Sequence, residues 1–196
     1  MVSNEEILVN KRNGRGKEAL QIDKIHAMVG FATEGITGVS ASHVEMNSGI
    51  QIFDGISTSD IQQILIKSAN DLITLENPNY QYVAARLLLF SLRKQLFHKL
   101  WDHPKLIDHI KKLIEMGLYD KDILVKYDES EIDRMDMWID HERDYNFTYA
   151  GLRQVMDKYL VQDRSTGDIF ETPQFMYMMI SATLFAQYPK DKRMSY

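Results

Sequence analysis

Residues 80–100 read YQYVAARLLLFSLRKQLFHKL and are apolar on most sides when placed on a helix. A helix of this kind is buried among other helices and does not lie on a surface. Before it, residues 58–72 keep helical spacing behind a Ser57-Thr58-Ser59 cap, and Asn77-Pro78-Asn79 separates the two segments. The run therefore predicts a mainly α protein whose first part is a helix bundle.

The segment that precedes these helices has the pattern of a β-hairpin. Residues 6–12 are predicted to form a short strand, residues 13–16 (NGRG) tolerate positive φ, and residues 17–21 form the return strand. Apolar residues then recur at helical spacing from Ile22 to Ala32, and residues 44–52 suit a second, short helix. A β-hairpin plus a four-helix bundle is expected over residues 1–100.

Pro104 marks the expected boundary, since it cannot continue the preceding helix and disfavours helical geometry at His103. Residues 101–196 are predicted to form a second, helical domain with a small hairpin around residues 164–167. Its predicted helices cover residues 105–116, 120–126, 129–139, 148–159 and a strong helix from Thr172-Pro173. The core stripe expected on that last helix is Phe175, Met176, Met179, Ile180, Thr183 and Leu184.

Composition excludes several classes of function. The 196 residues contain no cysteine, which removes disulfides, thiolate metal sites and cysteine nucleophiles, and the net charge of -5 disfavours nucleic-acid binding. We find no run long enough for a membrane span and no secretory signal, so a cytoplasmic protein is expected. Serine-hydrolase, Rossmann and P-loop motifs are missing.

Histidines and acids offer weak metal-site patterns. His98, His103 and His109 do not share one helical face at i and i+4, so we interpret them as structural histidines. The acids of residues 128–144 are interleaved with arginines and lack calcium-loop spacing, which favours a solvated helical face. No metal ligand and no catalytic residue is predicted.

One stretch suits a polyphosphate. Lys11 and Arg12 end the first strand, and Glu18 leads across the turn to Lys24-Ile25 at the start of the first helix. Cations beside free helix N–H groups suit phosphate, but a solvated hairpin rim explains the same spacing. By spacing alone Thr58 is a helix cap and Lys94 a surface lysine.

The ordered motifs resemble a known family. The hairpin with Lys11-Arg12 is followed by IDKI at 22–25, TSDI at 58–61, YQYVAAR at 80–86 and LRK at 92–94, and this order resembles the ATP-cone. Residues 139–144 (IDHERD), 158–162 (KYLVQ) and 171–175 (ETPQF) resemble the helical region that follows the cone in class I ribonucleotide reductase large subunits, of the bacterial and tailed-phage kind. Nearly the whole chain is covered.

The resemblance implies an allosteric site for ATP or dATP, with Mg²⁺ expected beside the triphosphate. Position by position, the phosphate contacts match Lys11, Arg12, Thr58 and Lys94, and Phe90 lies beside the sugar. The base-binding edge matches Glu18, Ala19, Leu20, Gln21, Ile22, Asp23, Lys24 and Ile25. Two positions depart from the pattern: the turn before Glu18 is one residue longer than in some relatives, so Lys17 competes for the acidic position, and Gln62 replaces a frequent histidine. We expect ATP binding to survive and leave discrimination against dATP open.

The resemblance also implies partners. In the family a ten-stranded barrel performs thiyl-radical reduction with a cysteine pair, and a small subunit delivers the radical. Barrel and cysteines are absent here, so the chain is either an excised fragment or one product of a split or truncated gene that needs a catalytic remainder. Two alternatives stay open: a stand-alone ATP-cone sensor, although repressors of that type carry a cysteine zinc ribbon, and a degenerate interaction domain without nucleotide.

Overall fold

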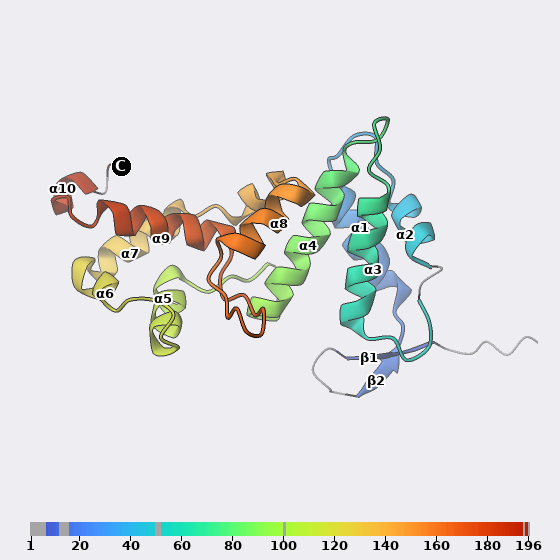
Figure 1. The fold of residues 1–196 in the computed structure, drawn as a ribbon, viewed down its shortest axis with the longest axis horizontal. Coiled ribbons are helices and arrows are strands. Elements are labelled where there is room, and N and C mark those ends of the chain that lie inside the picture. The colour runs from blue at the N-terminus through green and yellow to red at the C-terminus, as the bar shows by residue number, and fades with distance from the viewer. Residues whose placement is uncertain (1–6, 12–15, 50–51, 100, 194, 196) are drawn as a thin grey trace, which may run out of the picture. The chain divides into compact units, whose positions relative to one another are not determined.

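The computed structural model describes residues 7–11, 16–49, 52–99, 101–193 and 195 (Figure 1). Its contacts divide the chain into two compact units. The first unit comprises Met1–Ser91 and Tyr145–Leu152, and the second comprises Leu92–Asp144 and Arg153–Tyr196. The division into functional domains 1–100 and 101–196 stays a prediction.

The predicted hairpin opens the first unit. Strands β1 (Leu8–Asn10) and β2 (Lys17–Ala19) pair antiparallel, with Val9 opposite Glu18. Gly16 adopts a φ of +94°, and its carbonyl accepts a bond from the Lys11 amide at 3.1 Å. The turn residues 12–15, Arg12 included, lie outside the described residues. Two short strand-forming segments on either side of turn residues that tolerate positive φ were enough to predict this element.

Helices build the rest of the first unit. They are α1 (Ile22–Thr33), α2 (Ala41–Gly49), α3 (Thr58–Asp71) and the part of α4 (Tyr80–Phe97) up to Ser91. The apolar run of α4 is buried as predicted, including Val83, Leu87 and Phe90, and Leu65 and Ala69 of α3 are buried as well. Arg86 Nη1 donates to the Glu34 carbonyl at 2.6 Å and so joins α4 to the end of α1. A hairpin and helices in this order confirm the predicted architecture.

Short helices form the second unit. They are the end of α4, α5 (Leu106–Glu115), α6 (Asp122–Lys126), α7 (Glu129–Trp138), most of α8 (Tyr149–Lys158), α9 (Pro173–Phe185) and α10 (Lys190–Arg193). A 3-10 turn (His141–Asn146) belongs to this unit up to Asp144. Phe175 and Ala182 of α9 share one buried cluster with Leu106 and Ile110 of α5 and with Ile132 of α7. The predicted hairpin near residues 164–167 is reduced to a single bridge between Gln162 and Ile169.

One helix differs from its predicted packing. Phe175 and Met176 of α9 are buried as expected, but 48% of Ile180 and 67% of Leu184 are exposed. These two residues were predicted to belong to the apolar stripe of the helix. They lie instead on the side of α9 that faces away from the core of the second unit. Among the described residues, no helix combines the length and the apolar character needed to cross a bilayer.

Histidines join the core of the second unit. The rings of His103 and His141 stack with centroids 3.8 Å apart, and His109 stacks on Phe175 at 4.3 Å. Burial lowers the pKa of both His103 and His109 to about 4, so both are neutral near pH 7. This packing is that of structural histidines, whereas His98 is exposed. No group of three or more potential ligands in the described part of the chain could hold a metal ion.

Candidate functional site

The hairpin is joined to the start of α3 by backbone and side-chain hydrogen bonds. The Asn10 amide donates to the Ile56 carbonyl at 2.9 Å, and the Gly55 amide donates to Leu8 at 2.8 Å. The side-chain amide of Asn10 donates to the Gly55 carbonyl at 2.5 Å, and Asn10 forms a parallel bridge with Ser57. Strand β1 is therefore held in register against the loop that leads into α3.

This register places a cation and a helix start next to each other. Asn10 and Ser57 form the parallel bridge, and Lys11 and Thr58 are the residues that follow them. The backbones of Lys11 and Thr58 therefore lie next to each other. Thr58 is the first residue of α3, and the Ser57 side chain caps the helix by accepting from the Asp60 amide at 3.0 Å. The positive end of the α3 dipole thus lies near the Lys11 position. Asp60, whose carboxylate accepts from Ser57 Oγ at 2.7 Å, adds one negative charge there.

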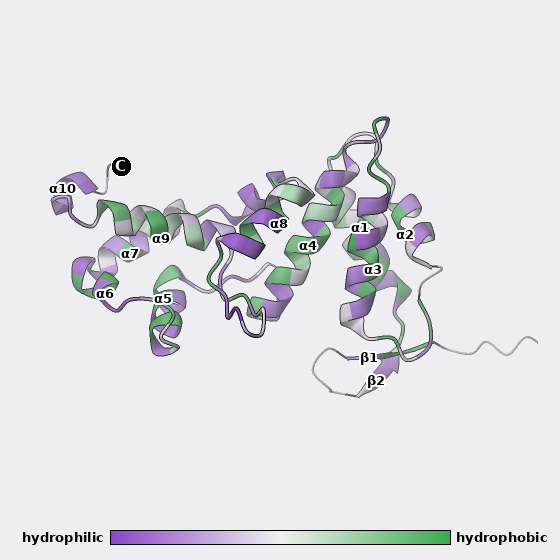
Figure 2. Cartoon of the chain, in the orientation of Figure 1, coloured by the Kyte–Doolittle hydropathy of each residue, from purple (hydrophilic) through white to green (hydrophobic). Residues whose placement is uncertain are grey.

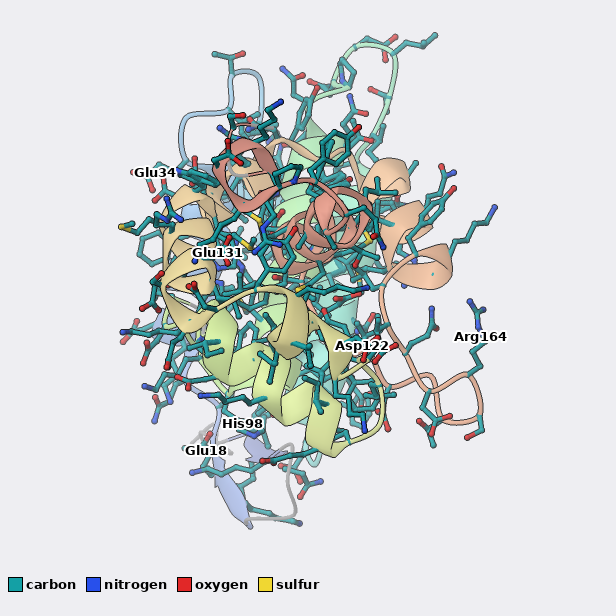
Figure 3. All side chains as sticks on the ribbon, turned by 90° about the vertical axis from the view of Figure 1, so that its left-hand side faces the viewer. Glu18, Glu34, His98, Asp122, Glu131 and Arg164 are labelled. Atoms are coloured by element: carbon teal, nitrogen blue, oxygen red, sulfur yellow. The ribbon has the colours of Figure 1, made fainter. Side chains whose placement is uncertain are left out.

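Lys11 has an acidic partner across the hairpin. Its Nζ lies 2.9 Å from Glu18 Oε2, and both side chains are partly exposed. The hydrogen bond from Lys11 holds the pKa of Glu18 below its usual range, with a smaller contribution from the charge of Lys24. Glu18, labelled on the hairpin in Figure 3, thus pairs with Lys11, while Lys17 faces Asn10 in the strand register, and the assignment of the acidic position to Glu18 stays a prediction.

A second helix start lies directly after the hairpin. Helix α1 begins at Ile22, and its cap residue Gln21 makes no side-chain capping bond. The first amides of a helix have no partner inside the helix, so an uncapped start leaves donors for an anion. The predicted base-binding edge runs through this point: Gln21, Ile22, Asp23 and Lys24 are exposed, while Ala19, Leu20 and Ile25 are half-buried.

An apolar cavity of about 230 Å³ adjoins that edge. Leu20, Ile22 and Ile25 form part of its lining, which continues with Ile7, His26, Glu45, Ser48, Gly49 and Ile52. Neither Lys11 nor Thr58 belongs to the lining, so the cavity adjoins the base side of the predicted site and not the phosphate side.

Gln62 has a structural partner inside the first unit. The residue is buried, and its side-chain amide donates to the Leu87 carbonyl at 2.9 Å. The bond joins α3 to α4. Phe90 is buried three residues further along α4 and meets the Tyr145 ring edge to face, with centroids 6.2 Å apart.

For two of the predicted phosphate contacts, the structure gives no side-chain position relative to Lys11. Arg12 lies outside the described residues. Lys94 belongs to the last turn of α4, which is part of the second unit. The convergence of Lys11, Arg12 and Lys94 on one triphosphate stays a prediction.

Sequence reasoning missed Asn10, whose side-chain amide holds the hairpin against the loop before α3. The available signal was a polar amide side chain inside a three-residue strand.

Comparison with known proteins assigns both parts of the chain. Residues 7–95 match the ATP cone domain, and residues 145–196 match the domain described as "ribonucleotide reductase, all-alpha domain". Ribonucleoside-diphosphate reductase 1 subunit alpha of Escherichia coli is 48% identical over 98% of this chain. The subunits alpha of Enterobacteria phage T4 and Helicobacter pylori are 41% and 37% identical over 94% and 91% of it.

The match covers only part of each relative. The chain spans 25% of the Escherichia coli subunit and 24% of the phage T4 subunit. The two domain matches occur in the order of the predicted cone and helical region. The chain therefore belongs, along almost its whole length, with the N-terminal region of ribonucleoside-diphosphate reductase alpha subunits.

Proposed function

We propose that the first unit binds ATP or dATP and that this binding regulates deoxyribonucleotide synthesis by a reductase whose catalytic part lies outside these 196 residues. The observation that supports this most is the register between β1 and the loop before α3, which brings Lys11 next to the helix start at Thr58. A lysine beside helix N–H groups is a common arrangement for binding phosphate.

In this proposal the triphosphate lies between the hairpin and the start of α3. Lys11 exchanges part of its contact with Glu18 for a phosphate oxygen, and Thr58 supplies its hydroxyl and amide. Arg12 and Lys94 complete the phosphate side, and Mg²⁺ neutralises the remaining charge. The edge from Glu18 to Ile25 holds the base through backbone and side-chain hydrogen bonds, next to the apolar cavity described above.

Gln62 acts differently from the other proposed contacts. A buried glutamine that donates to Leu87 has no charge to offer a phosphate, and its protonation does not change near pH 7. We propose that it supports the site by holding α3 against α4. Discrimination between ATP and dATP then depends on the residues around the sugar, including Phe90.

Regulation follows from differential binding. A nucleotide shifts an assembly equilibrium only when it binds one assembly more tightly than another. The partners required are the barrel-bearing remainder of the large subunit and the radical-bearing small subunit, because a chain without cysteine cannot form a thiyl radical or supply a reducing pair. The site of action is the cytoplasm in which that enzyme works.

Calorimetry with ATP and dATP tests the proposal. We expect micromolar binding of ATP to the full chain, and we expect Lys11→Ala and Lys94→Ala each to weaken it by about 1 to 3 kcal/mol, the range for a lost charge-assisted hydrogen bond. Lys67→Ala is the matched control, because Lys67 lies on α3 of the same unit and pairs with Asp71 on the exposed side.

Other results point to the alternatives. No heat with either nucleotide contradicts the proposal and favours a degenerate interaction domain. Binding of ATP by a chain that never associates with a barrel-bearing chain favours a stand-alone sensor. Equal losses in Lys11→Ala and Lys67→Ala indicate nonspecific attraction between the nucleotide and surface lysines.

A further inference from the structure

Arg93 is an unusual residue for its place in α4. Hydrophobic residues fill the middle of this helix in Figure 2, and the neighbours Phe90 and Leu92 are buried. The Arg93 side chain lies among them and is only 1% exposed. An arginine keeps its charge at any ordinary pH, so its burial is unfavourable unless nearby groups compensate that charge. The second unit therefore has to supply partners for this guanidinium.

The partners come from the 3-10 turn and from the start of α9. Arg93 Nη2 donates to the His141 carbonyl at 2.6 Å and lies 3.7 Å from Asp144 Oδ2. Asp144 is 1% exposed, and its Oδ1 accepts from the side-chain amide of Gln174 at 2.8 Å. We call Arg93, Asp144, Gln174 and the His141 carbonyl the Arg93 clamp. All of these residues belong to the second unit.

The buried carboxylate of the clamp is compensated mainly by charge. Asp144 Oδ2 has no hydrogen-bond partner among the described residues, so its attraction to Arg93 is Coulombic. Burial raises the pKa of Asp144 to about 6, which leaves the carboxylate ionised at pH 7.5. Apolar residues of similar volume often stabilise a protein as well as a buried ion pair does. Stability alone therefore does not account for the clamp, whereas fixing one arrangement of the elements that carry it does.

The clamp fixes the direction of the next residue, Lys94. Successive residues of an α-helix point about 100° apart around the axis, so anchoring Arg93 in the interior also sets where Lys94 points. Lys94 is half-buried in the last turn of α4, which ends at Phe97, and His98 leaves the helix with a φ of 60°. Helix ends open more readily than helix interiors. A buried anchor one turn before the end therefore keeps Lys94 in place.

We propose that the Arg93 clamp is a positioning element of the nucleotide site, which holds the last turn of α4 so that Lys94 presents its ammonium group to the triphosphate. This inference rests on the proposed function, in which Lys94 is a phosphate contact. Arg93 is a positioning residue, because so buried a side chain reaches no ligand and acts through Lys94. The second unit, through Asp144 and Gln174, then sets part of the affinity for ATP.

A double-mutant cycle on the full chain tests the inference. Calorimetry measures the ATP affinity of wild type, Arg93→Met, Lys94→Ala and the double variant. We expect Arg93→Met to weaken ATP binding about tenfold when Lys94 is present and less than about twofold when position 94 is already alanine. Arg193→Met is the matched control, since it breaks another ion pair of the second unit, with the buried Glu131, and should leave the ATP affinity unchanged.

Amide spectra separate positioning from a general structural role. In wild type ATP should shift the Lys94 amide, and in Arg93→Met that shift should disappear while the amides of Lys11 and Thr58 still respond. Asp144→Asn keeps the shape of the side chain and an oxygen for Gln174 but removes the charge, and it should weaken ATP binding about threefold through the same dependence on Lys94. This variant carries the cycle if circular dichroism shows that Arg93→Met does not fold.

The outcomes separate this inference from the proposed function. Equal weakening by Arg93→Met with lysine and with alanine at position 94 overturns the clamp, because the loss then does not pass through Lys94. Unchanged ATP affinity in folded Arg93→Met overturns it as well. If Lys94→Ala binds ATP like wild type, the clamp has no contact to position, while nucleotide binding through Lys11 still holds. Wild type that binds no ATP contradicts the proposed function and the clamp together.

Discussion

Replacing His109 by phenylalanine is expected to make the second unit less sensitive to acid. His109 is only 2% exposed, and its ring stacks on Phe175. Its Nε2 has no hydrogen-bond partner among the described residues, and Tyr119 meets the ring edge to face at 6.0 Å. Burial, with a smaller contribution from the charge of Lys112, lowers the pKa of His109 to about 4.

The magnitude follows from proton linkage. An unfolded histidine takes up a proton with a pKa of about 6.5, whereas folded His109 stays neutral until the pH approaches 4. Between these values the unfolded state binds more protons, so the folded state loses stability as the pH falls. At pH 5 the loss from this one residue is about 2 kcal/mol relative to pH 7.5. Asp144, whose pKa burial raises to about 6, works in the opposite direction and offsets part of the total.

Urea unfolding at pH 7.5 and pH 5.0 measures the effect. The chain has two tryptophans, Trp101 and Trp138, and both lie in the second unit, so fluorescence reports on that unit. We expect the stability difference between the two pH values to shrink by about 2 kcal/mol in His109→Phe, with less than about 1.5 kcal/mol of change at pH 7.5 for a ring of similar shape. The exposed His98→Asn serves as the control, since asparagine tolerates its φ of 60°. An unchanged pH dependence in His109→Phe would refute this reasoning.

Three further substitutions test individual contacts. Asn10→Ala should remove the side-chain bond that holds the hairpin, costing about 1 kcal/mol of stability and weakening ATP binding; unchanged affinity in calorimetry would contradict that role. Gln62→Leu should lower the melting temperature by the loss of its bond to Leu87 while changing ATP affinity less than about threefold; a loss of affinity without destabilisation would make Gln62 a direct ligand contact. Arg193 donates to both carboxylate oxygens of the buried Glu131 at 2.7 Å, so Arg193→Met should destabilise the second unit by about 3 kcal/mol in urea unfolding. A cost below about 1 kcal/mol would show that solvent reaches Glu131.

Local sequence patterns predicted most of the elements. The hairpin followed from two short strand-forming segments on either side of the turn residues NGRG, and α4 followed from a run that is apolar on most sides. Helices α5 and α7 lie within a residue or two of their predicted bounds, because caps and apolar spacing are encoded locally. The ATP-cone order and the reductase motifs were also predictable, since the comparisons match both.

Long-range packing was not predictable in the same way. The period of α9 places Phe175 and Leu184 in apolar positions, but it does not tell which of two apolar sides faces the core. The position of Gln62 was predicted as part of the site, and its bond to Leu87 depends on how α3 meets α4. The second hairpin was overestimated, because turn residues at 164–167 fix a tight turn without supplying strands long enough to pair.

Amide chemical shifts test the central claim most directly. In a nitrogen-15 labelled sample of this 22.8 kDa chain, saturating ATP should shift the amides of Lys11, Ser57, Thr58 and the segment from Glu18 to Ile25. Resonances of α5 and α7 should stay in place. Millimolar ATP that shifts none of the first set, or that shifts only resonances of the second unit, would contradict nucleotide binding between the hairpin and the start of α3.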